Sequence, residues 1–173
     1  MLVVFRGLPG TGKTYLARRL LDRRPDLLVL SRDTLRTAIF TKPTFSDDEK
    51  AFVDDLIVAI AGYLLGRKSS VVVEGMALSS ARRLRELAKT ATEHRTALRI
   101  IECTCSETTA LSRIAGDQGS HPAADRGPEL YYRIAKRYES TELPFLRVDT
   151  DRPMEQNLIA VLGYIDNPLS EGA

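Results

Sequence analysis

The sequence is poor in cysteine, in aromatic residues and in net charge. Its 173 residues include two cysteines, two histidines and no tryptophan, and 25 basic against 23 acidic side chains leave a formal net charge of +2. Two cysteines cannot build a disulfide framework, so a reducing, cytoplasmic environment is favoured. The balanced charge gives no bulk argument for binding nucleic acid or a membrane surface.

Long apolar runs are also missing. No stretch approaches the length of about 20 residues that a membrane-spanning helix needs. A glycine-rich loop begins as early as Gly7, so we expect no signal peptide before it. With 43% hydrophobic and 28% charged residues, the composition is that of one compact domain, which we place at residues 1–166, followed by a short tail at 167–173.

Short apolar runs alternate with longer segments of helical period. Five runs are predicted as strands, at residues 2–5, 27–30, 71–73, 98–101 and 144–148. Several of them are apolar without alternation, as expected for strands that are covered on both faces. The pattern predicts an α/β fold, a three-layer α/β/α sandwich with a five-stranded parallel sheet. In such an open sheet, ligands bind at the carboxyl ends of the strands.

A capping box at residues 46–49 (SDDE) predicts the start of a long helix. Phe52, Leu56, Ile60 and Tyr63 then recur at helical spacing, so we expect this stripe to face the core, with Gly66 ending the helix.

Residues 7–14 (GLPGTGKT) match the G-x-x-x-x-G-K-[ST] pattern of a phosphate-binding loop in full. A strand is predicted before the loop and an amphipathic helix after it, which is the context that the pattern requires. Gly10 and Gly12 allow backbone N–H groups to converge on an anion, and the dipole of the helix points at the same place. Lys13 can reach the β- and γ-phosphates, and the Thr14 hydroxyl can ligate Mg²⁺. The residues predicted to contact the nucleotide are Gly10, Thr11, Gly12, Lys13, Thr14 and Tyr15.

Two acidic residues follow neighbouring predicted strands. Asp33 comes after the second strand and Glu74 ends the third, so both could face the γ-phosphate. A hydroxyl acceptor must lose its proton as it attacks this phosphate, and a carboxylate can take it. We expect Asp33 to do so, with Arg36 one turn along as a contact for an anionic or polar acceptor. Alternatively, Asp33 caps a helix, and Glu74 either organises magnesium through water or orients a neighbouring loop.

Residues 116–127 (GDQGSHPAADRG) form the longest irregular stretch, and their glycines would let the segment close over a ligand. Arg113 lies just before this stretch and Arg126 within it, and either cation could stabilise charge on the transferred phosphoryl group. A solvated surface loop is the alternative. Arg133 and Arg137 share a helix face and could point towards phosphate, although a solvated face is the simpler interpretation.

With these residues, the chain resembles the P-loop kinases of the polynucleotide-kinase and zeta-toxin group, small kinases of the AAA type. The resemblance rests on residues 7–14, on Asp33 and Arg36 within SRDTLR (31–36), and on Arg113. It implies a parallel five-stranded core, ATP as donor, Mg²⁺, Asp33 as general base and Arg36 as acceptor contact. It also implies a helical lid at about residues 113–127 that carries Arg113 over the phosphates, and a loop at residues 149–152 near the adenine.

The sequence departs from that group in two places. Glu74, Gly75 and Met76 stand where polynucleotide kinases usually have an acidic residue and a threonine–asparagine pair, and Asp117 takes the place of a second lid arginine. Both departures disfavour a nucleic-acid end as the acceptor.

The sequence therefore predicts a kinase that transfers the γ-phosphoryl group of Mg·ATP to a hydroxyl of a small-molecule or nucleotide-like acceptor. Its assigned catalytic residues are Lys13, Asp33 and Arg113, and its assigned substrate-binding residues are Arg36, Glu74 and Arg126. Two alternatives stay open, a polynucleotide 5′-hydroxyl kinase and a nucleotide-dependent ATPase or switch module without a small-molecule acceptor.

Overall fold

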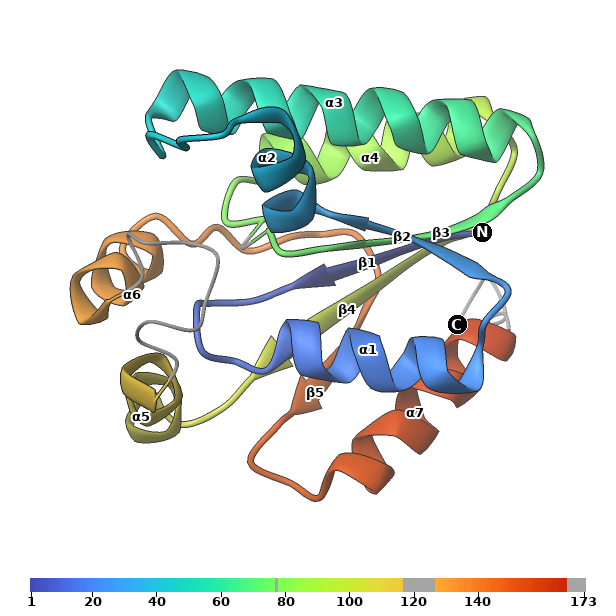
Figure 1. Ribbon diagram of the computed structural model, residues 1–173. Coiled ribbons are helices and arrows are strands. Elements are labelled where there is room, and N and C mark those ends of the chain that lie inside the picture. Colours follow the sequence, from blue (N-terminus) through green and yellow to red (C-terminus); the bar gives the residue numbers. More distant parts are fainter. Residues whose placement is uncertain (77, 117–126, 168–173) are drawn as a thin grey trace.

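The computed structural model of the chain describes residues 1–76, 78–116 and 127–167. Within these ranges the backbone forms five strands and seven helices (Figure 1). In chain order they are β1 (Leu2–Arg6), α1 (Lys13–Arg23), β2 (Leu27–Ser31), α2 (Arg32–Ile39), α3 (Asp47–Gly66), β3 (Ser70–Glu74), α4 (Ala81–Glu93), β4 (Leu98–Thr104), α5 (Glu107–Gly116), α6 (Pro128–Ala135), β5 (Phe145–Asp149) and α7 (Met154–Asp166).

The five strands form one parallel sheet in the order β2-β3-β1-β4-β5. The first strand of the chain is therefore the central one, with β3 on one side and β4 on the other. Because all strands run in the same direction, their carboxyl ends lie at one edge of the sheet. The segments that follow β1, β2 and β3 meet at this edge, which carries the candidate site.

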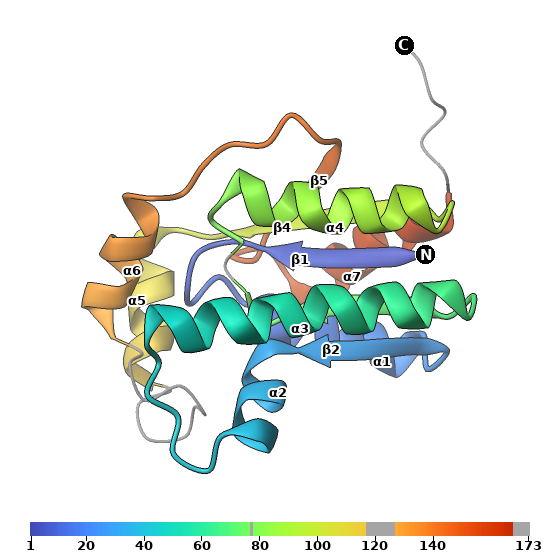
Figure 2. The same ribbon diagram turned by 90° about the horizontal axis from the view of Figure 1, so that it is seen from above.

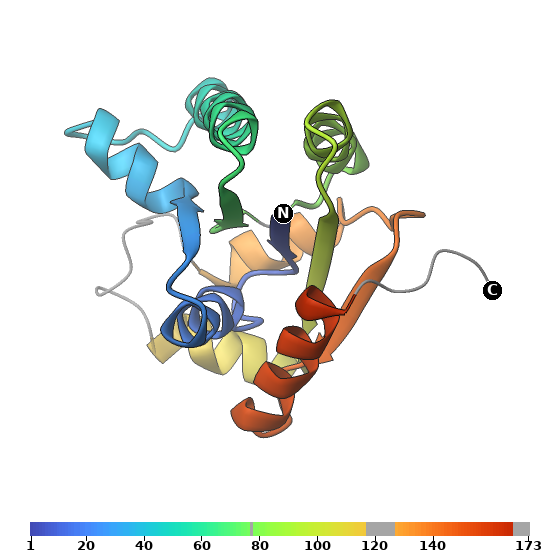
Figure 3. The same ribbon diagram turned by 90° about the vertical axis from the view of Figure 1, so that its right-hand side faces the viewer.

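Helices cover both faces of the sheet. α3 and α4 lie over one face, with α2 beside α3, whereas α1 and α7 lie over the other (Figures 1 and 3). α5 and α6 pack against each other beyond the carboxyl ends of the strands, as the view from above also shows (Figure 2). This arrangement confirms the predicted three-layer α/β/α sandwich with its five-stranded parallel sheet.

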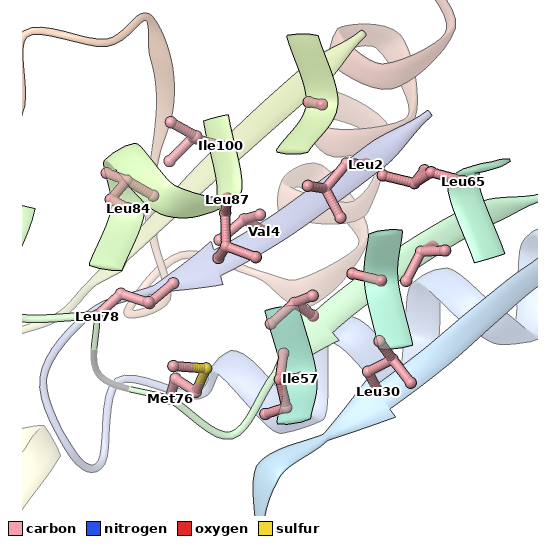
Figure 4. Close-up of a cluster of buried hydrophobic side chains, with 14 of the residues drawn as sticks. Leu2, Val4, Leu30, Ile57, Leu65, Met76, Leu78, Leu84, Leu87 and Ile100 are labelled. Carbon is pink, nitrogen blue, oxygen red and sulfur yellow. The ribbon is translucent and has the colours of Figure 1, made fainter. Parts of the chain in front are cut away.

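The central strand is apolar on both faces because each face meets its own core. Leu2 and Val4 join the cluster under α3 and α4, which Figure 4 shows, and Val3 and Phe5 join the cluster formed with α1 and α7. All four side chains are fully buried. Burying a side chain of this size contributes roughly 1.5–3 kcal/mol, so the strand before the phosphate loop is a rigid support for it.

The expected core stripe of α3 is wrong. Phe52 is 48% exposed and Tyr63 66% exposed, whereas the buried apolar residues of the helix lie one or two positions further along the chain. These are Val53, Ile57, Ala61 and Leu65. Apolar residues occur on nearly every side of this helix, so the period of the pattern alone could not distinguish the two stripes.

Among the residues that the structure describes, no helix combines the length and the apolar character that crossing a bilayer requires. The predicted tail at 167–173 falls almost wholly outside the described ranges, as does most of the predicted lid at 113–127.

Candidate functional site

The phosphate loop joins the central strand β1 to α1. Gly10 and Gly12 have φ angles of 79° and 76°, which a side chain would disfavour. Gly10 also lacks room for a side chain, because a Cβ there would lie 2.4 Å from the carbonyl oxygen of Ala110. Gly12 is the N-cap of α1, so the amino end of that helix opens towards the loop. The backbone therefore has the geometry that turns N–H groups towards an anion.

Lys13 and Thr14 begin α1 and face the mouth of the loop. The ammonium group of Lys13 donates hydrogen bonds to the carbonyl oxygens of Gly7, at 2.9 Å, and Leu8, at 2.7 Å. Its charge is thus held over the loop, where phosphate oxygens can replace the carbonyl contacts. The hydroxyl of Thr14 donates to Oε2 of Glu74 at 2.7 Å.

Thr14 and Glu74 offer the oxygen atoms that Mg²⁺ prefers. Glu74 ends β3 and is 6% exposed, so its carboxylate is buried beside the Thr14 hydroxyl. No group of three or more potential metal-binding side chains occurs among the described residues. Magnesium in phosphate-binding sites usually has one or two protein ligands, with phosphate oxygens and water completing its coordination. The two residues fit such an ion, because the Thr14 hydroxyl can bind it directly and the Glu74 carboxylate can bind it through a water molecule.

Asp33 lies in the first turn of α2, directly after β2. Ser31 caps this helix, since its hydroxyl oxygen accepts a hydrogen bond from the Thr34 backbone N–H. The capping role that Asp33 could have had therefore belongs to Ser31. The carboxylate of Asp33 instead pairs with Nη1 of Arg36 at 3.2 Å, as their spacing of three residues allows.

Arg36 is almost fully buried, with 3% of its surface exposed. Its Nε lies 2.9 Å from a carboxylate oxygen of Glu49, and its guanidinium carbon lies 5.0 Å from the ring centre of Phe45. The second amino group of Arg36, Nη2, has no hydrogen-bond partner among the described residues. Two carboxylates on different helices thus hold Arg36 in one orientation.

Glu49 supports the site through its contact with Arg36, and sequence reasoning assigned it only to a helix cap. Burial raises the pKa of Glu49. Hydrogen bonds from the backbone N–H and hydroxyl of Thr44 and from the N–H of Phe45 lower this pKa, as does the charge of Arg36, and together they outweigh the effect of burial. The net result is a lowered pKa, so the carboxylate stays charged beside Arg36. The sequence showed only that Glu49 lies three residues after the helix cap Ser46. This position does not predict the contact of Glu49 with Arg36.

Two cavities flank these residues. The larger has a volume of about 940 Å³ and follows the phosphate loop, α1 and the loop after β5. It is lined by Gly10, Gly12, Lys13, Thr14, Tyr15, Ala17, Arg18, Leu21, Val29, Ser31, Asp33, Thr34, Glu74, Arg113, Gly116, Thr150, Arg152 and Met154. The smaller has a volume of about 290 Å³ and lies between α2, α3, the segment after β3 and α6. It is lined by Pro9, Lys13, Thr14, Arg32, Asp33, Arg36, Phe45, Asp47, Lys50, Asp54, Gly75, Met76, Leu78, Ser79, Ser80, Arg83, Leu130, Arg133, Ile134 and Arg137.

Three residues line both cavities, and they are Lys13, Thr14 and Asp33. Five of the six residues predicted to contact the nucleotide line the larger cavity, including the exposed Tyr15. The sixth, Thr11, is buried, and its hydroxyl donates to the carbonyl oxygen of Leu8 within the loop. Arg36 lines only the smaller cavity. The site therefore has two compartments that meet at the end of the phosphate loop.

Arg113, in the last turn of α5, contacts the phosphate loop and lines the larger cavity. Its Nη1 donates to the carbonyl oxygen of Gly10 at 3.3 Å and to Oγ1 of Thr150 at 2.9 Å, and its Nη2 donates to the carbonyl oxygen of Thr150 at 2.9 Å. It thereby ties α5 and the loop after β5 to the phosphate loop. Arg126, the other lid candidate, lies outside the described residues.

Comparison with known families places the chain in one of them. The family model described as an AAA domain matches residues 2–130. The chain belongs to this AAA domain family. No curated protein is significantly similar to this AAA-domain chain in sequence.

Several solved structures share the fold of this AAA-domain chain. The APS kinase CysC of Mycobacterium tuberculosis, in complex with AMPPNP and APS, is 20% identical, with a TM-score of 0.71 over 96% of this chain and 97% of that one. Kti12 of Chaetomium thermophilum, in complex with ADP-AlF3, is 19% identical, with a TM-score of 0.71 over 95% and 99% of the two chains. A gluconokinase of Sinorhizobium meliloti is 18% identical, with a TM-score of 0.67 over 95% and 90%. The fold of this AAA-domain chain is therefore that of P-loop NTPases of the kinase type, while the narrower resemblance to polynucleotide kinases and zeta toxins stays a prediction.

A buried polar network supports the same edge of the sheet in this AAA-domain chain, and sequence reasoning missed it. Arg6, the residue before the phosphate loop, is 1% exposed and lies 3.3 Å from the carboxylate of Glu102. Its Nε donates to the hydroxyl of Tyr138 at 2.8 Å, and its Nη2 donates to the carbonyl oxygen of Glu139 at 2.7 Å. The sequence did contain a signal for this network, because Arg6 ends an otherwise apolar strand and a buried charge needs a partner.

Proposed function

We propose that this AAA-domain chain is an ATP-dependent kinase of the cytoplasm. It transfers the γ-phosphoryl group of Mg·ATP to a hydroxyl of a small-molecule or nucleotide-like acceptor. The observation that carries the proposal is the pair of cavities that share Lys13, Thr14 and Asp33. A transferase needs room for a donor and an acceptor on either side of the transferred group, and an aspartate belongs where the two meet.

The larger cavity is the place for the nucleotide. The backbone N–H groups of the loop and the amino end of α1 would bind the phosphates, with Lys13 at the β- and γ-phosphates. Thr14 and Glu74 would hold magnesium, which neutralises charge on the phosphate oxygens when bound. The base would lie towards Thr150 and Arg152, and Arg113 would keep the loop in shape. A direct contact of Arg113 or Arg126 with the phosphates, as the family resemblance implies, belongs to the same proposal.

Asp33 is the group that we assign to proton transfer. As the acceptor hydroxyl attacks the γ-phosphorus, its oxygen forms the new P–O bond and its proton passes to the Asp33 carboxylate. The bond between the γ-phosphorus and the bridging oxygen breaks, and ADP leaves with that oxygen. Arg36 holds Asp33 from the acceptor side at 3.2 Å, which fixes the direction of the carboxylate.

The smaller cavity also weighs against the two alternative functions. An ATPase or switch module needs only a nucleotide and water, so a second cavity that meets the first at Asp33 would have no role. A polynucleotide kinase needs a path for a chain of nucleotides, whereas a volume of about 290 Å³ is at the lower end for ligand pockets. A small acceptor fits both observations.

The proposal is tested by two substitutions with different expected effects. Lys13→Ala removes the cation at the phosphates, so nucleotide binding and all ATP turnover should be lost. Asp33→Asn keeps the shape of the side chain but cannot accept the proton, so binding of Mg·ATP should persist while phosphoryl transfer falls by roughly 10²–10⁴-fold. Nucleotide affinity is measured by calorimetry, and transfer by labelled phosphate in a panel of hydroxyl acceptors.

Asp22→Asn is the matched control, because Asp22 is an exposed aspartate of α1 whose side chain pairs with Arg19 and lines neither cavity. It should leave binding and transfer unchanged. Full transfer activity in Asp33→Asn would refute the base assignment. Absence of any affinity of the wild-type protein for magnesium–nucleoside triphosphates would refute the kinase proposal as a whole.

A further inference from the structure

The smaller cavity is bordered by more positive than negative side chains. Seven of its described lining residues are lysine or arginine, and three are aspartate. Part of this positive charge is compensated inside the protein, since Arg32, Arg36 and Arg83 each lie within 3.2 Å of a carboxylate. Lys50 and the two arginines on the α6 side, Arg133 and Arg137, line the cavity as well.

Arg133 and Arg137 lie four residues apart, on α6 and just after its end. Both are exposed, as the sequence led us to expect, but both also line the smaller cavity and neither lines the nucleotide cavity. No side-chain hydrogen bond or ion pair joins Arg137 to any residue that the structure describes. A cationic group at the mouth of a cavity attracts an anion from solution and can donate several hydrogen bonds to it.

Arg36 provides a second, independent sign of a ligand. Its side chain is buried, its Nε and Nη1 face carboxylates, and its Nη2 has no hydrogen-bond partner among the described residues. A buried donor without a partner costs about 1–3 kcal/mol. Arg36 also lines the smaller cavity, so part of this arginine belongs to the cavity wall.

The cavity also limits the size and type of the ligand. Its volume of about 290 Å³ suits a small molecule. Phe45 is the only aromatic side chain among its described lining residues, and the guanidinium of Arg36 already lies against that ring. The cavity therefore offers poor stacking for a nucleobase, and recognition must come from charge and hydrogen bonds.

We infer that the acceptor is a small alcohol that carries an oxyanion group, a phosphate, a sulfate or a carboxylate. The oxyanion is bound between Arg36 and the two arginines on the α6 side, Arg133 and Arg137, while the hydroxyl group of the same molecule meets Asp33. This inference rests on the proposed kinase function, because it takes the smaller cavity as the acceptor site. It adds the chemical class of the acceptor and two binding residues.

The test uses simple oxyanions as probes. Inorganic phosphate, sulfate and acetate are each titrated into the wild-type protein whose nucleotide site is saturated with Mg·AMPPNP, so that the phosphate loop cannot bind them. Binding is followed by NMR, and the order of affinities distinguishes the three oxyanions. We expect at least one probe to bind, and Arg133→Ala and Arg137→Ala each to weaken it roughly tenfold or more, since one charge-assisted hydrogen bond is lost.

The control is Arg82→Ala, which removes an exposed arginine of α4 that does not line either cavity. It should bind the probe as the wild-type protein does. If no probe binds, or if the probe binds Arg133→Ala and Arg137→Ala as tightly as the wild-type protein, the inference is wrong.

The same titration separates this inference from the proposed function. Failure of Mg·AMPPNP to bind would refute the kinase proposal itself. Normal binding of Mg·AMPPNP without binding of any oxyanion would refute only the acceptor class. Matched alcohols extend the test, because glycerol 3-phosphate should compete with the bound probe and glycerol should not; equal competition by both would also overturn the inference.

Discussion

The hydroxyl of Thr14 can donate its proton to Glu74 and can also bind a magnesium ion through its oxygen. In the structure it donates to the Glu74 carboxylate at 2.7 Å. A cation bound by a lone pair of the Thr14 oxygen would have the negative charge of Glu74 nearby. The buried carboxylate of Glu74 would then act on the ion through a bound water, which is one of the two roles the sequence left open.

Glu74→Gln tests this role, because glutamine keeps an oxygen that can accept the Thr14 hydrogen bond but loses the charge. We expect the Mg²⁺ concentration required for half-maximal AMPPNP binding to rise roughly tenfold, since one charge-assisted interaction is lost. Metal-free nucleotide affinity should not fall. Calorimetric titrations over a series of Mg²⁺ concentrations measure both. Glu93→Gln, an exposed glutamate of α4, is the control; an unchanged Mg²⁺ requirement in Glu74→Gln would leave Glu74 with a purely structural role.

Sequence spacing predicted some contacts of single residues and could not predict others. The pairing of Asp33 with Arg36 follows from their separation of three residues in one helix, which is a local property. The pairing of Arg36 with Glu49 joins two helices. No local pattern encodes it, since it depends on how α2 packs against α3.

At the scale of elements, the segment between α6 and β5 is tied to both β1 and α4. The Tyr138 hydroxyl accepts from Arg6 and lies 3.3 Å from Oε2 of Glu102, to which it donates. The backbone N–H of Glu139 donates to Ser79, and the carboxylate of Glu139 accepts from the N–H of Ala81 at the start of α4. These contacts place α6, and with it one wall of the smaller cavity, relative to the phosphate loop.

Tyr138→Phe removes the hydroxyl from this network. We expect the free energy of unfolding to fall by about 1–3 kcal/mol at neutral pH, because the part-buried hydrogen bonds of the Tyr138 hydroxyl with Arg6 and Glu102 are lost. Urea denaturation followed by circular dichroism measures the change. Tyr63→Phe is the control, since Tyr63 is 66% exposed and its hydroxyl makes no hydrogen bond to the described residues.

The stability difference between wild type and Tyr138→Phe should also change in alkaline solution. Burial raises the pKa of Tyr138 to about 12, with Arg6 opposing the rise and Glu102 adding to it. Since the folded-state pKa exceeds the value near 10 of an unfolded tyrosine, its contribution to stability is present below pH 10 and is lost as the pH rises towards 12. The stability difference between wild type and Tyr138→Phe should therefore shrink over this interval. A constant difference would show that Tyr138 does not titrate with folding.

Elements were predicted well where both faces of a strand are buried and poorly where a helix is apolar all round. Four of the five residues of β1 are apolar, so the sequence predicted a strand covered on both faces. α3 carries apolar residues on nearly every side, and the stripe that faces the sheet is decided by the position of α3 over β3. That position is a tertiary property and is absent from the helical period.

At the scale of the whole molecule, the two cavities differ in how much of them the sequence could reveal. The nucleotide cavity is built around one continuous segment, from the phosphate loop into α1, and its motif was complete. The smaller cavity takes its walls from α2, α3, the segment after β3 and α6, which are spread over about a hundred residues. Their convergence needs the strand order β2-β3-β1-β4-β5, so the acceptor site could not be predicted from any one segment.

Nucleotide binding should stabilise the entire domain. The nucleotide cavity is lined by residues of β2 and of the loop after β5, and β2 and β5 are the two edge strands of the sheet. A ligand that binds only the folded state at one hundred times its Kd adds about 2.7 kcal/mol to the free energy of unfolding. For a chain of this size that corresponds to a rise in Tm of roughly 5–11 °C. Calorimetric scans with and without Mg·AMPPNP measure the rise, which Asp22→Asn should share and Lys13→Ala should lose. An equal rise in Lys13→Ala would mean that the nucleotide binds elsewhere than at the phosphate loop.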